Sequence, residues 1–289
     1  MTAPEAPGRA AALGRFLEIQ NLGLNLPFAL AFLLTASGGW PTLRNAGLIV
    51  IAFVAARNAG HSFNRYADRD VDARNPRTAG RLLARDPGAG RYALAFAAAN
   101  AAVLVVCAAL LSLLALALVP VALLLVLGYS YTKRFTSLTT LFLGLVEAIT
   151  PAAVYAGVTD ALPLAAFVAV GAILAWGTAF ETIHSLGDRT SDAALGLRSL
   201  PVVLGERRSL GLLVGAHGIA LALFAAFGWV AGLRPGFYAG WAALAVLTVV
   251  TDRWVFADPS ASRRPFQMHF VLSALFLLAV VLGLFGPTG

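Results

Sequence analysis

Long apolar runs alternate with short polar segments along this chain, and the alternation predicts a bundle of membrane-spanning helices. A helix needs about 20 consecutive, mostly apolar residues to cross a bilayer. The apolar stretch 92–131 is roughly twice that length, so we place a tight turn near Ser112 to Leu114. The pattern predicts nine spans, at 22–38, 46–63, 92–112, 114–131, 138–157, 162–183, 209–231, 236–251 and 266–286.

Composition supports an all-α, polytopic membrane protein. Hydrophobic residues make up 59% of the 289 positions and charged residues only 12%, whereas about 25% of residues are charged in soluble domains. The single cysteine, Cys107, has no partner in the chain, which excludes an intrachain disulfide and a CxxC metal site. The sequence has no Walker, GxSxG, HExxH or CxxCH motif, so it gives no support for an ATP-driven pump or a haem carrier.

Basic residues are distributed unevenly over the predicted loops. A net charge of +7 would suggest a nucleic-acid ligand in a soluble protein, but membrane proteins collect Lys and Arg on their cytoplasmic side. With the amino terminus inside, only Arg44, Arg57 and Arg234 lie elsewhere, which leaves 18 of the 21 basic residues in inner segments. We predict a multi-pass protein of the plasma or inner membrane with an outside carboxyl terminus and no nucleic-acid or protein partner.

The first span also has features of a secretory signal peptide, because Arg9 and Arg15 precede an apolar run that ends in small residues. We expect it to remain uncleaved, since Gln20, Asn21 and Asn25 are out of place in the apolar part of a signal peptide. Its removal would also require the other spans to start from the opposite side.

Two groups of acidic residues stand where apolar runs end, and each has a four-residue spacing. Asn64, Asp68 and Asp72 follow the second span, and Asp188 and Asp192 follow the sixth. Side chains four residues apart lie on one helix face, where like charges repel unless a cation lies between them. Magnesium suits such a site, because it takes one or two carboxylates together with water and substrate phosphates. We predict that the four aspartates hold Mg²⁺ at the cytoplasmic face and act in catalysis.

Arginines near both acidic groups are candidates for binding a diphosphate. Arg65, Arg77 and Arg81 accompany the first group, together with Asn64, and Arg198 follows the second. Guanidinium groups match phosphate oxygens with paired hydrogen bonds. One such segment alone could equally be a solvated, charge-balanced loop. The second, similarly spaced segment favours a binding site.

The segment after the fourth span carries the only lysine of the chain, Lys133, next to Arg134 and four residues after Tyr129. That spacing puts a phenol and an ammonium group on one helix face, where both could meet a diphosphate and assist its reaction. The alternative is that these basic residues only orient the helix in the membrane.

Ionisable residues also lie within predicted spans, where they are costly and usually functional. Arg57 stands one turn before His61, and Glu147 and Glu181 lie in the fifth and sixth spans. Arg57 is available to pair with either glutamate, and such a pair would serve substrate binding or the register of the helices. His61 and His184 lack the third nitrogen or sulfur ligand that zinc requires.

The two acidic groups occupy corresponding places, each after the second span of a four-span unit. We therefore predict a single transmembrane domain over 1–289, composed of two related halves at about 16–131 and 134–251 and a ninth helix at 266–286. Sites in repeated membrane folds commonly lie between the halves.

Three motifs, in this order, resemble the UbiA superfamily of intramembrane aromatic prenyltransferases. They are Asn64-x-x-x-Asp68-x-x-x-Asp72 with Asn75-Pro76-Arg77-Thr78 and Arg81, then Tyr129-x-x-x-Lys133-Arg134, then Asp188-x-x-x-Asp192 with Gly196, Ser199 and Pro201. The Asn-Pro-Arg-Thr run most resembles the 4-hydroxybenzoate polyprenyltransferase branch, which includes relatives in menaquinone biosynthesis. His184 and Gly187 depart from the residues common in the family at those places.

The resemblance implies a nine-helix fold in which both aspartate motifs bind Mg²⁺ and a polyprenyl diphosphate. The prenyl group would move to an aromatic acceptor such as 4-hydroxybenzoate or a naphthoate-type quinone precursor. Mg²⁺ and arginines would neutralise the leaving diphosphate while an electron-rich ring attacks the allylic cation. Two alternatives stay open: a terpene cyclase of the same fold, which needs no acceptor, and a non-catalytic carrier of isoprenoid phosphates.

Overall fold

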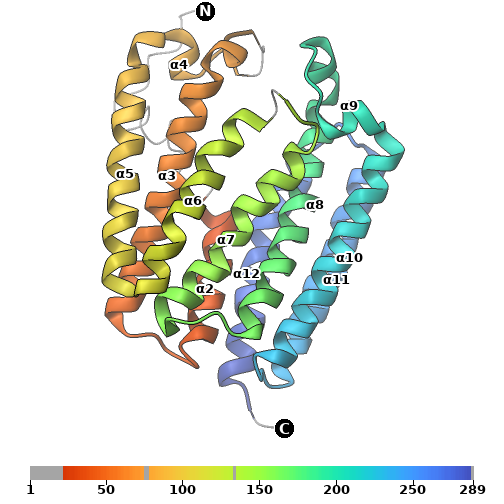
Figure 1. Ribbon diagram of the computed structural model, residues 1–289. Helices are drawn as coiled ribbons and strands as arrows, with labels where there is room; N and C mark the ends of the chain where they lie inside the picture. Colours follow the sequence, from red (N-terminus) through yellow and green to blue (C-terminus); the bar gives the residue numbers. More distant parts are fainter. Residues whose placement is uncertain (1–21, 75–77, 133–134, 288–289) are drawn as a thin grey trace, which may run out of the picture.

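The structure is a computed structural model that describes residues 22–74, 78–132 and 135–287. Within those ranges, all regular secondary structure is helical, and Figure 1 shows the helices side by side in one bundle. The helices are α2 (Leu22–Ala36), α3 (Leu43–Arg74), α4 (Leu82–Arg85), the 3₁₀ helix η2 (Pro87–Ala89), α5 (Gly90–Leu111), α6 (Leu113–Thr132), α7 (Thr139–Thr159), α8 (Leu164–Ala194), α9 (Leu200–Leu204), α10 (Glu206–Val230), α11 (Gly236–Ala257) and α12 (Arg263–Phe285).

The nine predicted spans correspond to α2, α3, α5, α6, α7, α8, α10, α11 and α12. In the described part of the chain, eight of these helices are long and apolar enough to cross a membrane, and α2 is apolar but has only 15 residues. The prediction of an all-α, multi-pass membrane protein is confirmed. Hydropathy locates the spans well because the bilayer imposes a minimum length of apolar helix.

Two helices continue far beyond their apolar segments. The predicted spans end at residues 63 and 183, but α3 runs to Arg74 and α8 to Ala194. The span ends differ from the helix ends because hydropathy marks where a helix leaves the membrane, and polar residues continue the helix beyond that point. The Asn64 amide donates to the Asp68 carboxylate at 3.1 Å, for example. Both acidic groups therefore lie on continuous helices.

The predicted turn between α5 and α6 is formed at Ser112, whose extended backbone (φ −160°, ψ 164°) interrupts the helix. The Ser112 hydroxyl accepts a hydrogen bond from the Ala115 N–H at 2.9 Å and donates to the Ala156 carbonyl at 2.7 Å. The Asp160 carboxylate accepts from the Leu114 N–H at 3.0 Å. These oxygens satisfy backbone donors at the start of α6 that have no partner within the helix.

The first and last helices of the chain lie side by side in the bundle. Figure 1 places α4 and α9 at one end of the bundle and the last turn of α12 at the other. Helix α12 packs against α2, so the last helix closes the bundle onto the first. Between them the ring centroid of Phe28 lies 5.2 Å from that of Phe276 and 5.8 Å from that of Trp176, which belongs to α8. Beside this aromatic core, α2, α3, α6, α7 and α8 surround a common interior.

Helices α7 and α8 approach each other closely at Gly144 and Gly177. A Cβ atom on Gly144 would lie 2.7 Å from the Leu174 carbonyl oxygen, and one on Gly177 would lie 3.0 Å from the Gly144 Cα. Small residues permit such close packing between membrane helices. The contact brings the cavity-facing residues of α7 and α8 towards the same interior.

The two long helices, α3 and α8, are each followed by a short helix. Helix α3 has 32 residues and is followed by the four-residue α4, and α8 has 31 residues and is followed by the five-residue α9. Two related halves would produce this parallel, and the division of the chain into halves stays a prediction.

The loop between α11 and α12 packs against α8 at Gly187. A Cβ atom there would lie 2.6 Å from the Ser262 Oγ, so glycine suits this departure from the family pattern. The loop is held by Ser260, whose hydroxyl and N–H donate to the Asp258 carboxylate at 2.6 and 3.0 Å. These hydrogen bonds lower the pKa of Asp258 from its usual value.

Candidate active site

A cavity of about 650 Å³ opens between α2, α3, α6, α7 and α8. Its lining also includes Arg81, from the segment before α4, and Phe266 of α12. The other described lining residues are Leu24, Asn25, Phe28, Phe32, Phe53, Ala56, Arg57, Gly60, His61, Asn64, Val126, Tyr129, Leu143, Val146, Glu147, Ile149, Thr150, Ile173, Trp176, Phe180, Glu181, His184 and Asp188.

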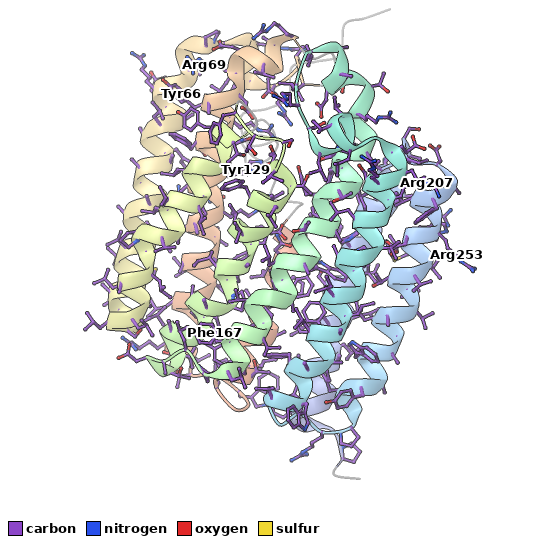
Figure 2. The ribbon with its side chains drawn as sticks, turned by 45° about the vertical axis from the view of Figure 1, so that its right-hand side comes forward. Tyr66, Arg69, Tyr129, Phe167, Arg207 and Arg253 are labelled. Carbon is purple, nitrogen blue, oxygen red and sulfur yellow. The ribbon has the colours of Figure 1, made fainter. Side chains whose placement is uncertain are left out.

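The lining changes from charged to apolar along the helices. Arg81, His184 and Asp188 line the part nearest to α4 and α9, and Phe53 and Trp176 line the opposite part. Basic side chains lie near the same end: Figure 2 shows Arg69 and Arg207 towards it, whereas Phe167 lies towards the other end. The cavity suits an amphipathic ligand that has an anionic head and an apolar tail.

The acidic face of α3 begins at the cavity wall. Asn64 lines the cavity, and its amide donates to Asp68 at 3.1 Å and to the Ser130 hydroxyl of α6 at 3.4 Å. Asp68 is 4% exposed and follows Asn64 by one helical turn. Arg65 is also buried and lies with a guanidinium nitrogen 3.4 Å from the His61 ring.

Asp72 joins α3 to the segment before α4. Arg81 donates from one guanidinium nitrogen to both Asp72 oxygens, at 2.8 and 2.9 Å, and the Thr78 hydroxyl donates to the Asp72 carbonyl at 3.1 Å. Asp72 is 6% exposed, and Arg81 lines the cavity. This pair therefore fixes a guanidinium group at the charged part of the cavity.

The second acidic group lies on α8. Asp188 lines the cavity, and Asp192 follows it by one turn on the same helix. Arg189 instead bonds to Glu206 of α10 at 3.2 Å. Arg198 is exposed and is not in the cavity lining.

Some predicted residues cannot be placed. Arg77, Lys133 and Arg134 lie outside the described residues. In the part of the chain that the structure describes, no three His, Cys, Asp or Glu side chains lie close enough to hold a metal ion by themselves. The metal-binding role of the four aspartates stays a prediction.

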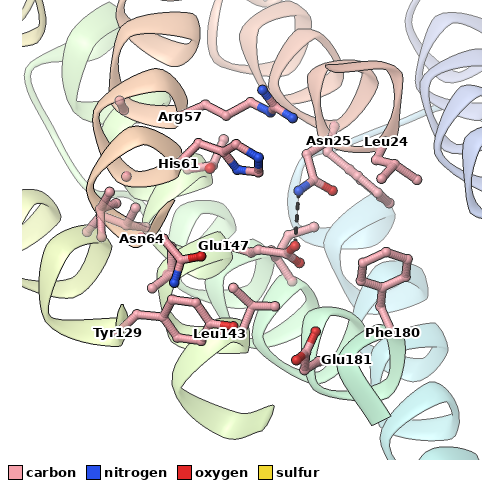
Figure 3. Close-up of a pocket in the computed structure, with 18 of the residues that line it drawn as sticks. Leu24, Asn25, Arg57, His61, Asn64, Tyr129, Leu143, Glu147, Phe180 and Glu181 are labelled. Carbon is pink, nitrogen blue, oxygen red and sulfur yellow. Dashed lines mark hydrogen bonds between the residues drawn. The ribbon is translucent and has the colours of Figure 1, made fainter. Parts of the chain in front are cut away.

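The middle of the cavity carries half-buried ionisable residues. The Asn25 amide of α2 donates to the Glu147 carboxylate of α7 at 3.0 Å. Figure 3 shows Arg57 and His61 of α3 across from Glu147, with Glu181 of α8 on its other side. The ion pair that we predicted between Arg57 and a glutamate stays a prediction.

A second, smaller cavity of about 90 Å³ adjoins the apolar part of the first. The two share the lining residues Phe53, Ala56, Val126, Ile149 and Thr150. The rest of its wall is apolar and comes from α3, α5, α6 and α7. Together the cavities form an apolar path that leads away from the acidic groups.

Sequence reasoning missed two sets of polar residues. It did not assign Asn25 to the site, although an amide within an apolar run is a usable signal. It also missed a buried group behind the cavity wall, where His217 Nδ1 lies 2.7 Å from Asp252 and the His217 ring lies 5.9 Å from the His269 ring. These residues belong to three helices, so no local spacing connects them.

Comparison with known proteins identifies the fold and the family. The model of the UbiA prenyltransferase family matches residues 25–275, which is most of the chain. The chain belongs to the UbiA prenyltransferase family. It is a prenyltransferase, and the resemblance seen in the three motifs is confirmed.

Relatives of this UbiA protein include the 4-hydroxybenzoate octaprenyltransferases of Shewanella sediminis and Aeromonas salmonicida. The first is 34% identical over 215 residues, or 74% of each chain, and the second is 33% identical over 222 residues, or 76% of each chain. The apo structure of a UbiA homologue from Aeropyrum pernix K1 matches with a TM-score of 0.81 and 30% identity, covering 91% of this chain and 98% of that one.

A UbiA homologue from Archaeoglobus fulgidus, bound to GPP and Mg²⁺, has a TM-score of 0.75. It is 19% identical, and the match covers 94% of this chain and 99% of that one. At this identity the likeness shows the shared fold.

Proposed function

We propose that this UbiA-family prenyltransferase uses Mg²⁺ to transfer a polyprenyl group from its diphosphate to an aromatic acceptor of the 4-hydroxybenzoate class. The main support is the cavity itself, which has carboxylates and a fixed guanidinium at one part and an apolar path at the other. The names of the curated relatives support the acceptor, and the homologue bound to GPP and Mg²⁺ supports the donor and metal.

The donor set suits magnesium. Asp68 and Asp72 are carboxylates on one face of α3, and Asp188 and Asp192 are carboxylates on one face of α8. Mg²⁺ commonly takes only one or two carboxylates and completes its shell with water and substrate phosphates, so a three-residue protein cluster is not required. When bound, the ion would supply charge neutralisation for the departing diphosphate.

The chain's own residues account for the rest of the reaction. Arg81, placed by Asp72, and Asn64 lie where they can bind the diphosphate, and Arg65, Arg77, Arg198, Lys133 and Arg134 remain candidates for it. The apolar part would hold the prenyl tail and exclude water, which would otherwise hydrolyse the allylic cation. Arg57 is the cation in the cavity middle that suits the carboxylate of an aromatic acid.

The orientation follows from charge. The end of the bundle that carries α4 and α9 also carries most of the described arginines, so we propose that the diphosphate site faces the cytoplasm of a plasma or inner membrane.

The direct test is turnover by the purified protein in detergent. Radiolabelled geranyl diphosphate, offered with 4-hydroxybenzoate and with a dihydroxynaphthoate, should give a prenylated aromatic acid that mass spectrometry identifies. Activity should disappear with EDTA and return with Mg²⁺. A terpene cyclase would instead give a hydrocarbon without acceptor, and a carrier would leave the diphosphate intact.

Substitutions test the acidic groups. Asp68→Asn and Asp192→Asn should each lower turnover by about 10²–10³-fold, and the double variant should be little worse, because members of one catalytic unit are not additive. Asp70 is a matched control on the same helix, since its side chain is 72% exposed. Asp70→Asn should retain near-normal turnover. Near-normal turnover by Asp68→Asn or Asp192→Asn would refute the mechanism.

A further inference from the structure

Prenylation of an aromatic ring, on which this inference rests, requires a base. The ring carbon forms its new C–C bond as the C–O bond of the prenyl diphosphate breaks, and the electron pair of that C–O bond leaves with the diphosphate. The ring carbon then carries both the prenyl group and its hydrogen. Aromaticity returns when the C–H bond breaks, its electron pair enters the ring and the proton passes to a base. Because water must be kept from the cation, the proton passes either to the departing diphosphate or to a side chain of the cavity.

The Glu147 carboxylate lies where such a base is needed. It lines the cavity from α7, with one carboxylate oxygen beside Gly177, which lies three turns of α8 before Asp188. Figure 3 shows it directed into the space that Arg57, His61 and Glu181 also face.

Two contacts fix the orientation of this carboxylate. On one oxygen, Glu147 accepts the hydrogen bond from the Asn25 amide at 3.0 Å. The other oxygen packs on α8, where a Cβ atom on Gly177 would lie only 2.5 Å from it. A carboxylate held between a donor and a helix backbone is preorganised, so little reorientation is needed during the reaction.

Other ionisable residues of the cavity are placed for different tasks. Asp188 and His184 line the charged part, where the diphosphate is proposed to bind. Glu181 lies on α8 with them, one turn before His184 and two turns before Asp188. We propose that Glu147 is the base that takes the ring proton, and that Asn25 is a positioning residue that holds it.

The test uses Glu147→Gln, which keeps an oxygen for the Asn25 hydrogen bond but removes the basic site. Turnover of geranyl diphosphate with 4-hydroxybenzoate should fall by about 10²–10⁴-fold, the usual contribution of a general base. The KM for geranyl diphosphate should stay unchanged, because the diphosphate residues are untouched. Asn25→Ala should give a smaller loss of kcat.

An isotope effect distinguishes this role from a structural one. With 4-hydroxybenzoate deuterated ortho to its hydroxyl, the wild type should show no primary isotope effect, because ring-proton loss is fast. Glu147→Gln should show one, because proton loss becomes slow, and Asn25→Ala should show a smaller one. Glu181→Gln is the matched control, since it makes the same change to another cavity carboxylate, and it should show none whatever its rate.

Each result bears on a different claim. A Glu147→Gln protein that is folded and transfers prenyl groups at the wild-type rate, or more slowly but without an isotope effect, would overturn the inference. A loss of thermal stability in detergent would identify a folding defect, and the isotope effect on the remaining activity would then decide. If the wild type prenylates no phenolic acid at all, the proposed function fails instead.

Discussion

The contact between α7 and α8 allows a quantitative prediction for Gly144→Ala. The new Cβ atom would lie 2.7 Å from the Leu174 carbonyl oxygen and 2.6 Å from the Thr178 Oγ1, well inside the 3.4 Å of an ordinary contact. The carbonyl belongs to the backbone of α8 and cannot rotate away. The two helices must therefore separate, and Glu147, one turn along α7, must move with them.

The magnitude follows from two opposing terms. Overpacking of a tight contact costs about 1–3 kcal/mol, whereas alanine is favoured over glycine inside a helix by about 0.5–1 kcal/mol. We expect a net loss of about 1 kcal/mol, within a range of about 0–2.5 kcal/mol. Displacement of a catalytic group by about 1 Å can cost about 10²-fold in rate, so prenyl transfer should fall by more than the loss of folded protein explains.

Gly215→Ala is the matched control. Gly215 lies within α10, and a Cβ atom there would meet nothing within 4 Å. This variant should be as stable as the wild type or more stable, with unchanged turnover. Thermal unfolding in detergent gives the stability, and turnover per folded protein gives the rate. The reasoning is refuted if Gly144→Ala unfolds and turns over like the wild type, or if both alanine variants lose stability equally.

Three further predictions concern other parts of the bundle. Reporter fusions in the α7–α8 turn and at the α9–α10 junction should report opposite sides of the membrane, and the same side for both would disprove the nine-span topology. Asp252→Leu should cost about 1–3 kcal/mol in thermal unfolding, because it leaves the buried His217 Nδ1 without its hydrogen-bond partner. Adding His217→Leu should recover part of that loss, and a double variant no more stable than the single one would exclude coupling. Ala122→Phe should fill the smaller cavity and raise the KM of long prenyl diphosphates but not of geranyl diphosphate. Val121 is on the exposed side of α6, so Val121→Phe should change neither KM. Equal effects on all chain lengths would count against the apolar path.

The spans and the acidic groups could be predicted because their signals are local. A run of about 20 apolar residues has few alternatives to a membrane helix. Asp68 and Asp72, like Asp188 and Asp192, share a face of one helix, so their proximity depends only on helical geometry. The predicted span ends differ from the ends of α3 and α8 for a related reason, since hydropathy follows the membrane and not the helical hydrogen bonds.

The contacts between helices could not be predicted from the sequence. Several of the bundle helices are apolar on all sides, and such a helix gives no signal of which face turns inward. Asn25 and Glu147 are separated by 122 residues and meet only because α2 packs beside α7. The pairing of His217 with Asp252 depends in the same way on α10 and α11.

The sequence by itself determined the class of protein, the approximate spans, the acidic motifs and the family, because hydrophobic length, helical period and motif order are properties of the chain. Only the tertiary structure decided which face of each helix lines the cavity, where the apolar path leads, and that Asn25 and Gly177 hold the Glu147 carboxylate. These features depend on close packing between helices, which small residues such as Gly144 permit and which hydropathy does not record.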